Sequence, residues 1–278
     1  MSVTNDLVTD QRVNKSCLTL QKVGFDVVLV GRKLPNSPSM DKRTYACHRM
    51  KLIFKKGALF YAEYNIRLFF YLLFHRANCF LSNDLDTLLP NYLVAKIKGV
   101  QLIYDSHEYF TEVPELVNRP KVQNIWKKIE EYVLPKLDEM ITVNESIADL
   151  FRKKYGIEVN VIRNIPMRGN LPNIASKEKL GLPRDKYLLL LQGSGINIHR
   201  GSEELLEAME YLENCHLVII GSGDVVPILK QTVKTKGWED RVTFFSRMPY
   251  QQMMAITQLA VCKTGQLQRM KRPCTNVN

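Results

Sequence analysis

Two short apolar runs, each followed by a Gly-Ser-Gly triplet, place the tightest constraint on how this chain can fold. The runs are Tyr187 to Leu191, followed after one residue by the triplet at 193–195, and Leu217 to Ile220, followed directly by the triplet at 221–223. Such runs are typical of strands buried on both faces of a sheet. Residues 202–212 between them carry apolar side chains at helical spacing. The pattern predicts a βαβ unit with both glycine turns at the carboxyl edge of one parallel sheet, where ligands of open α/β sheets bind.

The first glycine turn leads into Arg200, Gly201 and Ser202, where the predicted helix begins. Free backbone N–H groups and the positive end of a helix attract phosphate, and an arginine fork suits a diphosphate. Glycines after a buried strand also occur simply because the chain must turn, and this spacing is neither GxGxxG nor a P-loop. The residues alone therefore leave two interpretations, a phosphate site and an ordinary turn.

Length, hydrophobicity and cysteine usage describe a folded chain. Its 278 residues, 45% of them hydrophobic, can bury a core in one or two domains. The six cysteines form no CxxC pair and no histidine cluster accompanies them, so we expect reduced thiols and no metal site. The first residues have neither the basic nor the apolar region of a signal peptide. We therefore expect a cytoplasmic protein.

The charge of the chain bears on its partners. A net charge of +11 predicts an acidic partner, such as a nucleotide, a nucleic acid or an anionic membrane surface. No stretch interleaves aromatic residues with arginine and glycine as RNA-binding proteins do. We therefore expect no nucleic-acid partner.

The N-terminal residues predict an incomplete first strand. Met1 to Thr4 is interpreted as the tail of a strand, too short to be a whole one, and residues 5–11 as a polar loop. A helix over 12–23, stopped by Gly24, and a strand over 25–30 follow. An α/β domain that nearly lacks its first strand is unusual, and we expect either a misplaced start codon or lost residues.

Residues 59–76 form the most aromatic stretch of the sequence. Glu63, Asn65 and Arg67 interrupt it, and its apolar run is too short for a membrane span. We favour a buried helix over a helix that lies on a membrane surface.

A group of polar residues, Asp105, Ser106, His107 and Glu108, directly follows a predicted buried strand at 100–104. The histidine could donate to a substrate hydroxyl or assist a proton transfer. Alternatively, Asp105 and His107 merely cap the loop and satisfy its backbone. The location at the end of a strand favours a functional role.

The remaining periodicity predicts an α/β protein with two Rossmann-like domains. The first covers 1–165, and the polar, proline-containing stretch at 166–176 predicts a linker. A second, partial domain covers 177–260 and contains both glycine turns. Residues 261–278 show no strand alternation, no helical stripe and no acidic residue, so we expect an aberrant tail.

Several stretches together resemble glycosyltransferase family 4 of the GT-B fold. NDLVTDQRV followed by a helix and DVVLVGR resembles the first βαβ unit of that family, and MITVNESIADLFRKKYG resembles its strand and helix before the linker. QGSGINIHRG is similar to the G-R-x5-K-G donor loop of the family. VIIGSGD resembles its second glycine turn, and VTFFSRMPYQQMMAITQLA its next strand and helix. The resemblance implies two Rossmann-like domains of GT-B type, the second incomplete.

The resemblance also implies roles for single residues. His107 corresponds to a histidine that contacts the donor sugar near the reacting centre, with Asp105 and Glu108 in its supporting loop. Arg200 stands where the family grips the donor diphosphate, and Ser194 where many members have an arginine. The implied donor-binding residues are Gly193, Ser194, Arg200, Gly221 and Ser222.

The implied activity is transfer of a hexose-like sugar from a nucleotide-sugar donor to a polysaccharide or lipid-linked acceptor, with retention of configuration. The donor is a substrate, and the resemblance implies no cofactor and no metal. Peripheral contact with the inner face of a membrane fits the basic charge. Two alternatives remain: an inactive remnant with a partial nucleotide site, and a nucleotide-sugar epimerase of the same fold.

The sequence departs from the family after Ala260. The Glu-x7-Glu pair of the family, which should contact the donor, has no counterpart in 261–278, and we hypothesise a shifted reading frame there. The apolar strands at 188–191 and 217–220 would then be covered on fewer sides. We therefore expect a marginal second domain and weak activity.

Overall fold

The computed structural model describes residues 1–8, 10–35, 37, 39–40, 42–165, 176–193, 195–260 and 262–263. The chain divides into two compact units, Met1–Pro166 and Met167–Asn278. Both are α/β, each built on a parallel sheet, which confirms the predicted fold class. The predicted linker at 166–176 lies outside the described residues except for Ser176.

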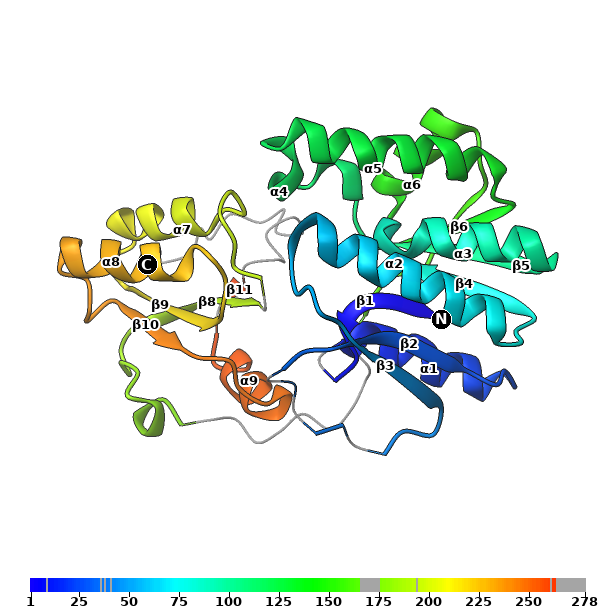
Figure 1. Ribbon diagram of the computed structural model, residues 1–278. Helices are drawn as coiled ribbons and strands as arrows, with labels where there is room; N and C mark the ends of the chain where they lie inside the picture. The colour runs from blue at the N-terminus through cyan, green and yellow to red at the C-terminus, as the bar shows by residue number, and fades with distance from the viewer. Residues whose placement is uncertain are drawn as a thin grey trace. The chain divides into compact units, whose positions relative to one another are not determined.

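The first unit is a seven-stranded parallel sheet with helices on both faces (Figure 1). The strand order is β3-β2-β1-β4-β5-β6-β7. The strands are β1 (Ser2–Asp6), β2 (Val28–Lys33), β3 (Ala46–Lys51), β4 (Cys79–Asn83), β5 (Gln101–Ser106), β6 (Glu139–Thr142) and β7 (Val159–Val161). The helices are α1 (Gln11–Lys22), α2 (Gly57–Phe74), α3 (Leu85–Lys98), α4 (Pro114–Val117), α5 (Pro120–Val133) and α6 (Glu145–Tyr155), with short 3₁₀ turns at Phe110–Glu112 and Leu134–Lys136.

Local sequence signals fix the ends of several helices in this unit. Asn144 caps α6 by accepting a hydrogen bond from the Ile147 N–H at 2.9 Å, and Gly156 ends the helix in the left-handed conformation. The stretch MITVNESIADLFRKKYG therefore forms a strand and a helix, β6 and α6, as its resemblance to the family implied. Asp10 caps α1 in the same way through the Val13 N–H at 3.0 Å.

The prediction of an incomplete first strand is wrong. β1 is a five-residue strand at Ser2–Asp6 that pairs with β2 on one side and β4 on the other. The sequence did not predict the end of this strand, because the polar residues Asn5 and Asp6 are typical of a loop. In the structure Asp6 is buried, accepts a hydrogen bond from the Leu34 N–H at 3.1 Å and forms an ion pair with Arg49. A polar strand end is stable when its groups have partners.

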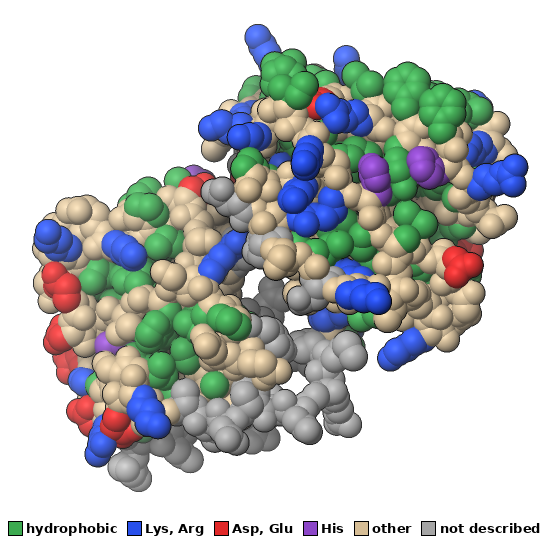
Figure 2. Space-filling view, turned by 60° about the horizontal axis from the view of Figure 1, so that its bottom comes forward, with side chains coloured by type: hydrophobic (Ala, Val, Ile, Leu, Met, Phe, Trp, Pro, Cys, Tyr) green, Lys and Arg blue, Asp and Glu red, His purple; other side chains and the backbone are tan. Residues whose placement is uncertain are grey.

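The aromatic helix α2 is buried along one face. Phe60, Tyr64, Leu68 and Leu72 recur every four residues and pack into the core with α3 and α5. The opposite face carries exposed apolar side chains: Leu59, Ile66, Phe70 and Phe74. Figure 2 shows apolar side chains at the surface of the first unit, next to lysine and arginine side chains. Within the described ranges, no helix combines the length and apolar composition that crossing a bilayer requires.

The second unit is a four-stranded parallel sheet with the order β10-β9-β8-β11. Its strands are β8 (Tyr187–Gly193), β9 (Cys215–Gly221), β10 (Val242–Phe245) and β11 (Cys262–Lys263). Its helices are α7 (Ser202–Ala208), α8 (Val226–Lys236) and α9 (Tyr250–Thr257), with short 3₁₀ turns at Glu178–Leu180 and Met209–Tyr211. β8, α7 and β9 form the βαβ unit that the two glycine triplets predicted, with Gly193 in register with Gly221.

Two expectations for the end of the chain need correction. The sequence past Ala260 predicted no strand, yet Cys262 and Lys263 pair with Leu189 and Leu190 of β8. A two-residue pairing uses backbone groups alone, so side-chain alternation could not reveal it. Both faces of β8 and β9 are also covered, by α7 and α8 on one side and by α9 on the other. Residues 264–278 of the predicted tail lie outside the described residues.

Candidate functional site

The carboxyl ends of β1, β4 and β5 come together in the middle of the first sheet. The chain builds β1, β2 and β3 in one direction and β4 to β7 in the other, so the strand order reverses between β1 and β4. Ligands of open α/β sheets bind at such a reversal, outside the carboxyl ends of the strands. The polar residues that follow β1, β4 and β5 form the candidate site of this unit.

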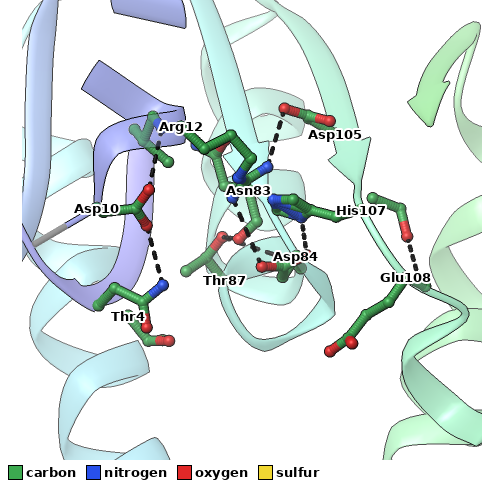
Figure 3. Close-up of polar contacts among 12 residues, drawn as sticks. Thr4, Asp10, Arg12, Asn83, Asp84, Thr87, Asp105, His107 and Glu108 are labelled. Carbon is green, nitrogen blue, oxygen red and sulfur yellow. Dashed lines mark hydrogen bonds and ion pairs between the residues drawn. The ribbon is translucent and has the colours of Figure 1, made fainter. Parts of the chain in front are cut away.

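His107 and Asp84 form the central pair of the site (Figure 3). The His107 Nδ1 atom lies 2.5 Å from Asp84 Oδ1, and both side chains are about four-fifths buried, with exposed fractions of 18% and 21%. When Nδ1–H of the neutral ring donates a hydrogen bond to the Asp84 carboxylate, the ring nitrogen Nε2 keeps its lone pair. The pair therefore orients an imidazole whose second nitrogen can contact a ligand.

The backbone around this pair is held in place. Asp84 adopts a positive φ of 62°, and its N–H donates to the Asp105 carbonyl at 2.9 Å. Ser106 Oγ donates to the Glu108 carbonyl at 2.8 Å, which fixes the turn that carries His107. A non-glycine residue in the left-handed region is uncommon and often marks a functional position.

Arg12 from α1 reaches both carboxylates at the strand ends. Its guanidinium lies 3.4 Å from Asp105 Oδ2 and 3.8 Å from Asp84 Oδ2. Burial raises the pKa of Asp105, and Arg12 counters that rise. Burial and the neighbouring Asp86 raise the pKa of Asp84, and Glu108 adds to the rise. Arg12 thus offsets part of the negative charge of this cluster, in which the described acidic groups outnumber it.

Asp86 in the first turn of α3 is the most deeply buried acid of the cluster. Thr4 Oγ1 donates to its Oδ2 atom at 2.6 Å, while Oδ1 has no hydrogen-bond partner among the described residues. Burial raises the pKa of Asp86 to about 6, although the hydrogen bond from Thr4 lowers it. An acid in this environment keeps its proton to a higher pH than an exposed aspartate does.

The structure brings His107 and Asp105 together through partners that the sequence analysis did not assign. Arg12 and Asp84 lie 72 residues apart in the chain and received no predicted role. One signal was available for Asp84, since it follows a predicted strand as Asp105 does. Glu108 contributes its charge to the cluster and its carbonyl to the turn.

The two glycine turns of the second unit pack directly against each other. A Cβ atom on Gly221, whose φ is 138°, would lie 1.8 Å from the Gly193 carbonyl oxygen, and one on Gly223 would lie 1.9 Å from the Ile196 carbonyl oxygen. The Ile196 N–H donates to the Ser222 carbonyl at 3.1 Å. Gly193, Gly221 and Ser222 therefore belong to one structure, while Ser194 lies outside the described residues.

Arg200 lies on the surface immediately before α7, next to Gly201 with a φ of 82°. The start of this helix already holds a carboxylate. Glu203 accepts hydrogen bonds from the His199 N–H at 3.2 Å and from Ser202 Oγ at 2.7 Å. Partial burial alone would raise the pKa of Glu203, but these hydrogen bonds lower it. A phosphate at this turn would have to share its donors with Glu203.

The described residues contain no cluster of three or more histidine, cysteine or acidic side chains arranged to hold a metal ion. Each unit thus has its own candidate groups: an oriented imidazole with an arginine and several acids in the first, and a pair of glycine turns with an arginine in the second.

Comparison with solved structures defines the class of the fold. The chain is similar to sucrose-phosphate synthase from Thermosynechococcus elongatus, with 17% identity, a TM-score of 0.73 and coverage of 90% of this chain and 68% of that one. It is similar to Anabaena HepE in complex with UDP and glucose, with 14% identity, a TM-score of 0.63 and coverage of 92% and 71%. The chain is also similar to UDP-N-acetylglucosamine 2-epimerase from Rickettsia bellii, with 12% identity, a TM-score of 0.63 and coverage of 96% of this chain and 74% of that one. These likenesses establish a GT-B fold with two Rossmann-like domains.

The family follows from a sequence match. The family described as Glycosyltransferase Family 4 matches residues 13–166, more than half of the chain. The chain belongs to glycosyltransferase family 4, and with the fold this assigns it a general glycosyltransferase role. The search of curated proteins found no match.

Proposed function

We propose that this protein transfers a sugar from a nucleotide-sugar donor to a saccharide or lipid-linked acceptor, with retention of anomeric configuration. The observation that carries the proposal is the His107–Asp84 pair at the strand-order reversal of a family 4 chain. An imidazole whose Nδ1 is held by a carboxylate presents Nε2 in one orientation, as a catalytic group near a reacting sugar requires.

In this proposal the second unit binds the nucleotide part of the donor. Gly193 is exposed at the end of β8, where backbone without a side chain allows a diphosphate to approach, and Gly221 packs against Gly193 and supports this turn. Arg200 supplies positive charge as the diphosphate departs and gains negative charge. Ser194 and Ser222 complete the proposed donor site. With these groups the reaction requires no metal and no other cofactor.

In the first unit His107 contacts the donor sugar through Nε2, either by hydrogen bonding to a hydroxyl or by moving a proton. Asp84 acts as a positioning residue, because it holds Nδ1 and stabilises positive charge on the ring. Arg12 offsets part of the charge of Asp84 and Asp105 and so reduces repulsion of an anionic donor.

Donor hydrolysis with water as the acceptor tests the proposal without knowledge of the natural acceptor. UDP-glucose and UDP-N-acetylglucosamine are the first donors to try, since solved structures of this fold bind UDP and glucose or act on UDP-N-acetylglucosamine. We expect release of UDP and of a sugar whose first-formed anomer retains the donor configuration, seen by NMR. His107→Ala should lower the rate about a hundredfold, the usual contribution of a positioned acid–base group.

The matched control is His75→Gln, because His75 is exposed on the first unit and lies outside the candidate site. EDTA should leave the rate unchanged. Equal rates for the parent chain and His107→Ala would contradict the proposed role. Sugar epimerised at C2 without any transfer would favour the epimerase alternative, and UDP binding without turnover would favour the inactive remnant.

We further propose that the exposed face of α2 contacts an anionic membrane surface. Leu59, Ile66, Phe70 and Phe74 follow each other at intervals of seven, four and four residues, so they lie along one face of the helix. The face lies on a chain with a net charge of +11, and anionic lipid headgroups complement that charge. Such contact would place the protein peripherally at the inner membrane face, close to a lipid-linked acceptor.

A further inference from the structure

A half-open pocket of about 350 Å³ lies at the carboxyl ends of β2 and β3, away from the His107–Asp84 pair. This volume is at the lower end of the range of small-molecule sites. Four of the side chains that line it are basic, namely Arg32, Lys33, Lys51 and Lys55. None of the lining residues in the described part of the chain is acidic.

The arrangement of the lysines is unfavourable without an anion. Lys33 of β2 is in register with Lys51 of β3, so both side chains leave the same face of the sheet on neighbouring strands. Like charges opposite each other destabilise a sheet. Three carboxylates interact with residues that line the pocket, and each also has another partner. Asp6 pairs with Arg49, and Glu63 accepts from the Ile53 and Phe54 N–H groups and pairs with Arg67. Asp86, whose charged form Arg32 favours, accepts a hydrogen bond from Thr4 Oγ1.

Arg32 gives the pocket a preformed wall. Its guanidinium stacks over the Phe60 ring at 4.5 Å and donates to the Lys55 carbonyl at 3.4 Å, which ties the segment before α2 to β2. Its Nε atom is buried and has no hydrogen-bond partner among the described residues. A buried donor without a partner costs free energy, and a bound acceptor oxygen would recover it.

The rest of the lining is apolar. Leu34, Pro35, Leu52 and Phe54 complete the wall between the basic side chains. Phe54 and Lys55 lead directly into α2, the helix with the exposed apolar face. A ligand that matches both kinds of lining must carry an anionic group and an apolar part.

We propose that this pocket binds a phosphate group that carries an apolar chain, the chemistry of a lipid-linked acceptor. This inference rests on the proposed transfer function for its biological meaning. Phosphate oxygens match the donors of Lys33 and Lys51, which share one face of the sheet, and charge-assisted hydrogen bonds are the strong ones. The apolar chain lies against Leu52 and Phe54.

Binding of octyl phosphate to the full chain tests the inference, with inorganic phosphate and octyl glucoside as probes of each half of the ligand. We expect calorimetry to show octyl phosphate binding more tightly than either probe. The double variant Lys33→Gln, Lys51→Gln should bind octyl phosphate about a hundredfold more weakly, because each of the two charged hydrogen bonds contributes about a factor of ten. The control Lys96→Gln, Lys128→Gln removes the same charge from two exposed helical positions and should stay within about twofold.

A third variant separates the apolar contribution. Phe54→Ser should weaken octyl phosphate binding several-fold and leave inorganic phosphate binding unchanged, since it removes apolar contact alone. Inorganic phosphate that binds as tightly as octyl phosphate would identify free phosphate as the occupant and overturn the amphiphilic ligand. Equal weakening in the two double variants would overturn the site itself.

The assay is independent of sugar transfer. Octyl phosphate is titrated without donor, so a chain that never turns over a nucleotide sugar still gives a result. Binding that depends on Lys33 and Lys51 in such a chain would support the pocket while the proposed function fails. Turnover of a nucleotide sugar by a chain whose octyl phosphate binding does not depend on Lys33 and Lys51 would support the proposed function and overturn the proposed phosphate site.

Discussion

Single buried acids set the chemistry of the first unit. His107, Arg12 and three aspartates lie at the strand ends, and the charges of Asp86 and Asp105 raise the pKa of Asp84. Asp84 is held beside the imidazole, whereas Asp86 lies deeper and contacts Thr4. The two residues differ in role although only one residue separates them. Asp84 orients a ligand-facing group, and Asp86 forms part of the packed wall behind it.

The buried state of Asp86 predicts a dependence of stability on pH. Its folded pKa of about 6 is above the ordinary value of 3.8, so the folded chain binds more protons than the unfolded chain between these pH values. Its contribution to stability is therefore full below the unfolded pKa and is lost as pH rises through 6. Asp86→Asn removes this loss. The variant should gain about 2 kcal/mol relative to the parent chain between pH 4.5 and 7.5.

Urea unfolding measured by Trp126 fluorescence checks this prediction, with Trp238→Phe in every chain so that the signal comes from the first unit. Comparing the gain between two pH values cancels any constant cost of the buried amide. Asp138→Asn, at an exposed position, should show no gain. A difference between parent and Asp86→Asn that does not change with pH would rule out a raised pKa at this residue.

The glycine turns show how two elements with the same sequence can carry different constraints. Both are Gly-Ser-Gly, yet the second is packed against backbone at Gly221 and Gly223, whereas an added Cβ on Gly195 would meet only the Asn197 side chain at 3.8 Å. The close approach of the two turns therefore requires glycine at 221 and 223, in the second triplet. This asymmetry belongs to the packing of the turns and has no counterpart in the sequence.

The packing predicts unequal effects of alanine in the two turns. Gly223→Ala places Cβ 1.9 Å from the Ile196 carbonyl oxygen, so the turns must separate, and we expect a loss of roughly 2 kcal/mol or more in stability of the second unit. Gly195→Ala has room and should change stability by less than about 0.5 kcal/mol. Urea unfolding followed by Trp238 in a Trp126→Phe background measures both. Equal destabilisation by the two substitutions would mean that the turns do not pack as described.

Strands and helices with strong periodic patterns were predictable, and those defined by polar or isolated contacts were not. The βαβ unit around Gly193 and Gly221 and the helix at 145–155 follow from apolar runs, caps and glycines. The full length of β1 was not predicted, because Asn5 and Asp6 are polar and resemble loop residues until their partners in the structure are known. At the site, His107 was identified from its place after a strand, but Arg12 comes from a helix far away in the chain. Pairing across that distance is a property of the fold.

In the proposed membrane contact, the charge of the whole molecule acts together with the apolar face of α2. A basic chain is attracted to any anionic surface, and this attraction weakens with salt. Apolar insertion is insensitive to screening and depends on particular side chains. Phe70 and Phe74 are 51% and 78% exposed on α2, which makes them the residues best placed to insert. A peripheral membrane protein needs both contributions, because either one alone gives weak, reversible binding.

Vesicle co-sedimentation should therefore show binding to phosphatidylglycerol vesicles and little binding to neutral phosphatidylcholine vesicles at 0.15 M salt, roughly physiological ionic strength. Phe70→Ser with Phe74→Ser should lower binding about tenfold, since two large apolar side chains no longer insert. The matched control, Tyr211→Ser with Ile228→Ser, removes side chains that are 85% and 50% exposed on the second unit and should retain binding. If both double variants bind as the parent does, and salt alone releases them, then attraction of charge accounts for the membrane contact and α2 has no part in it.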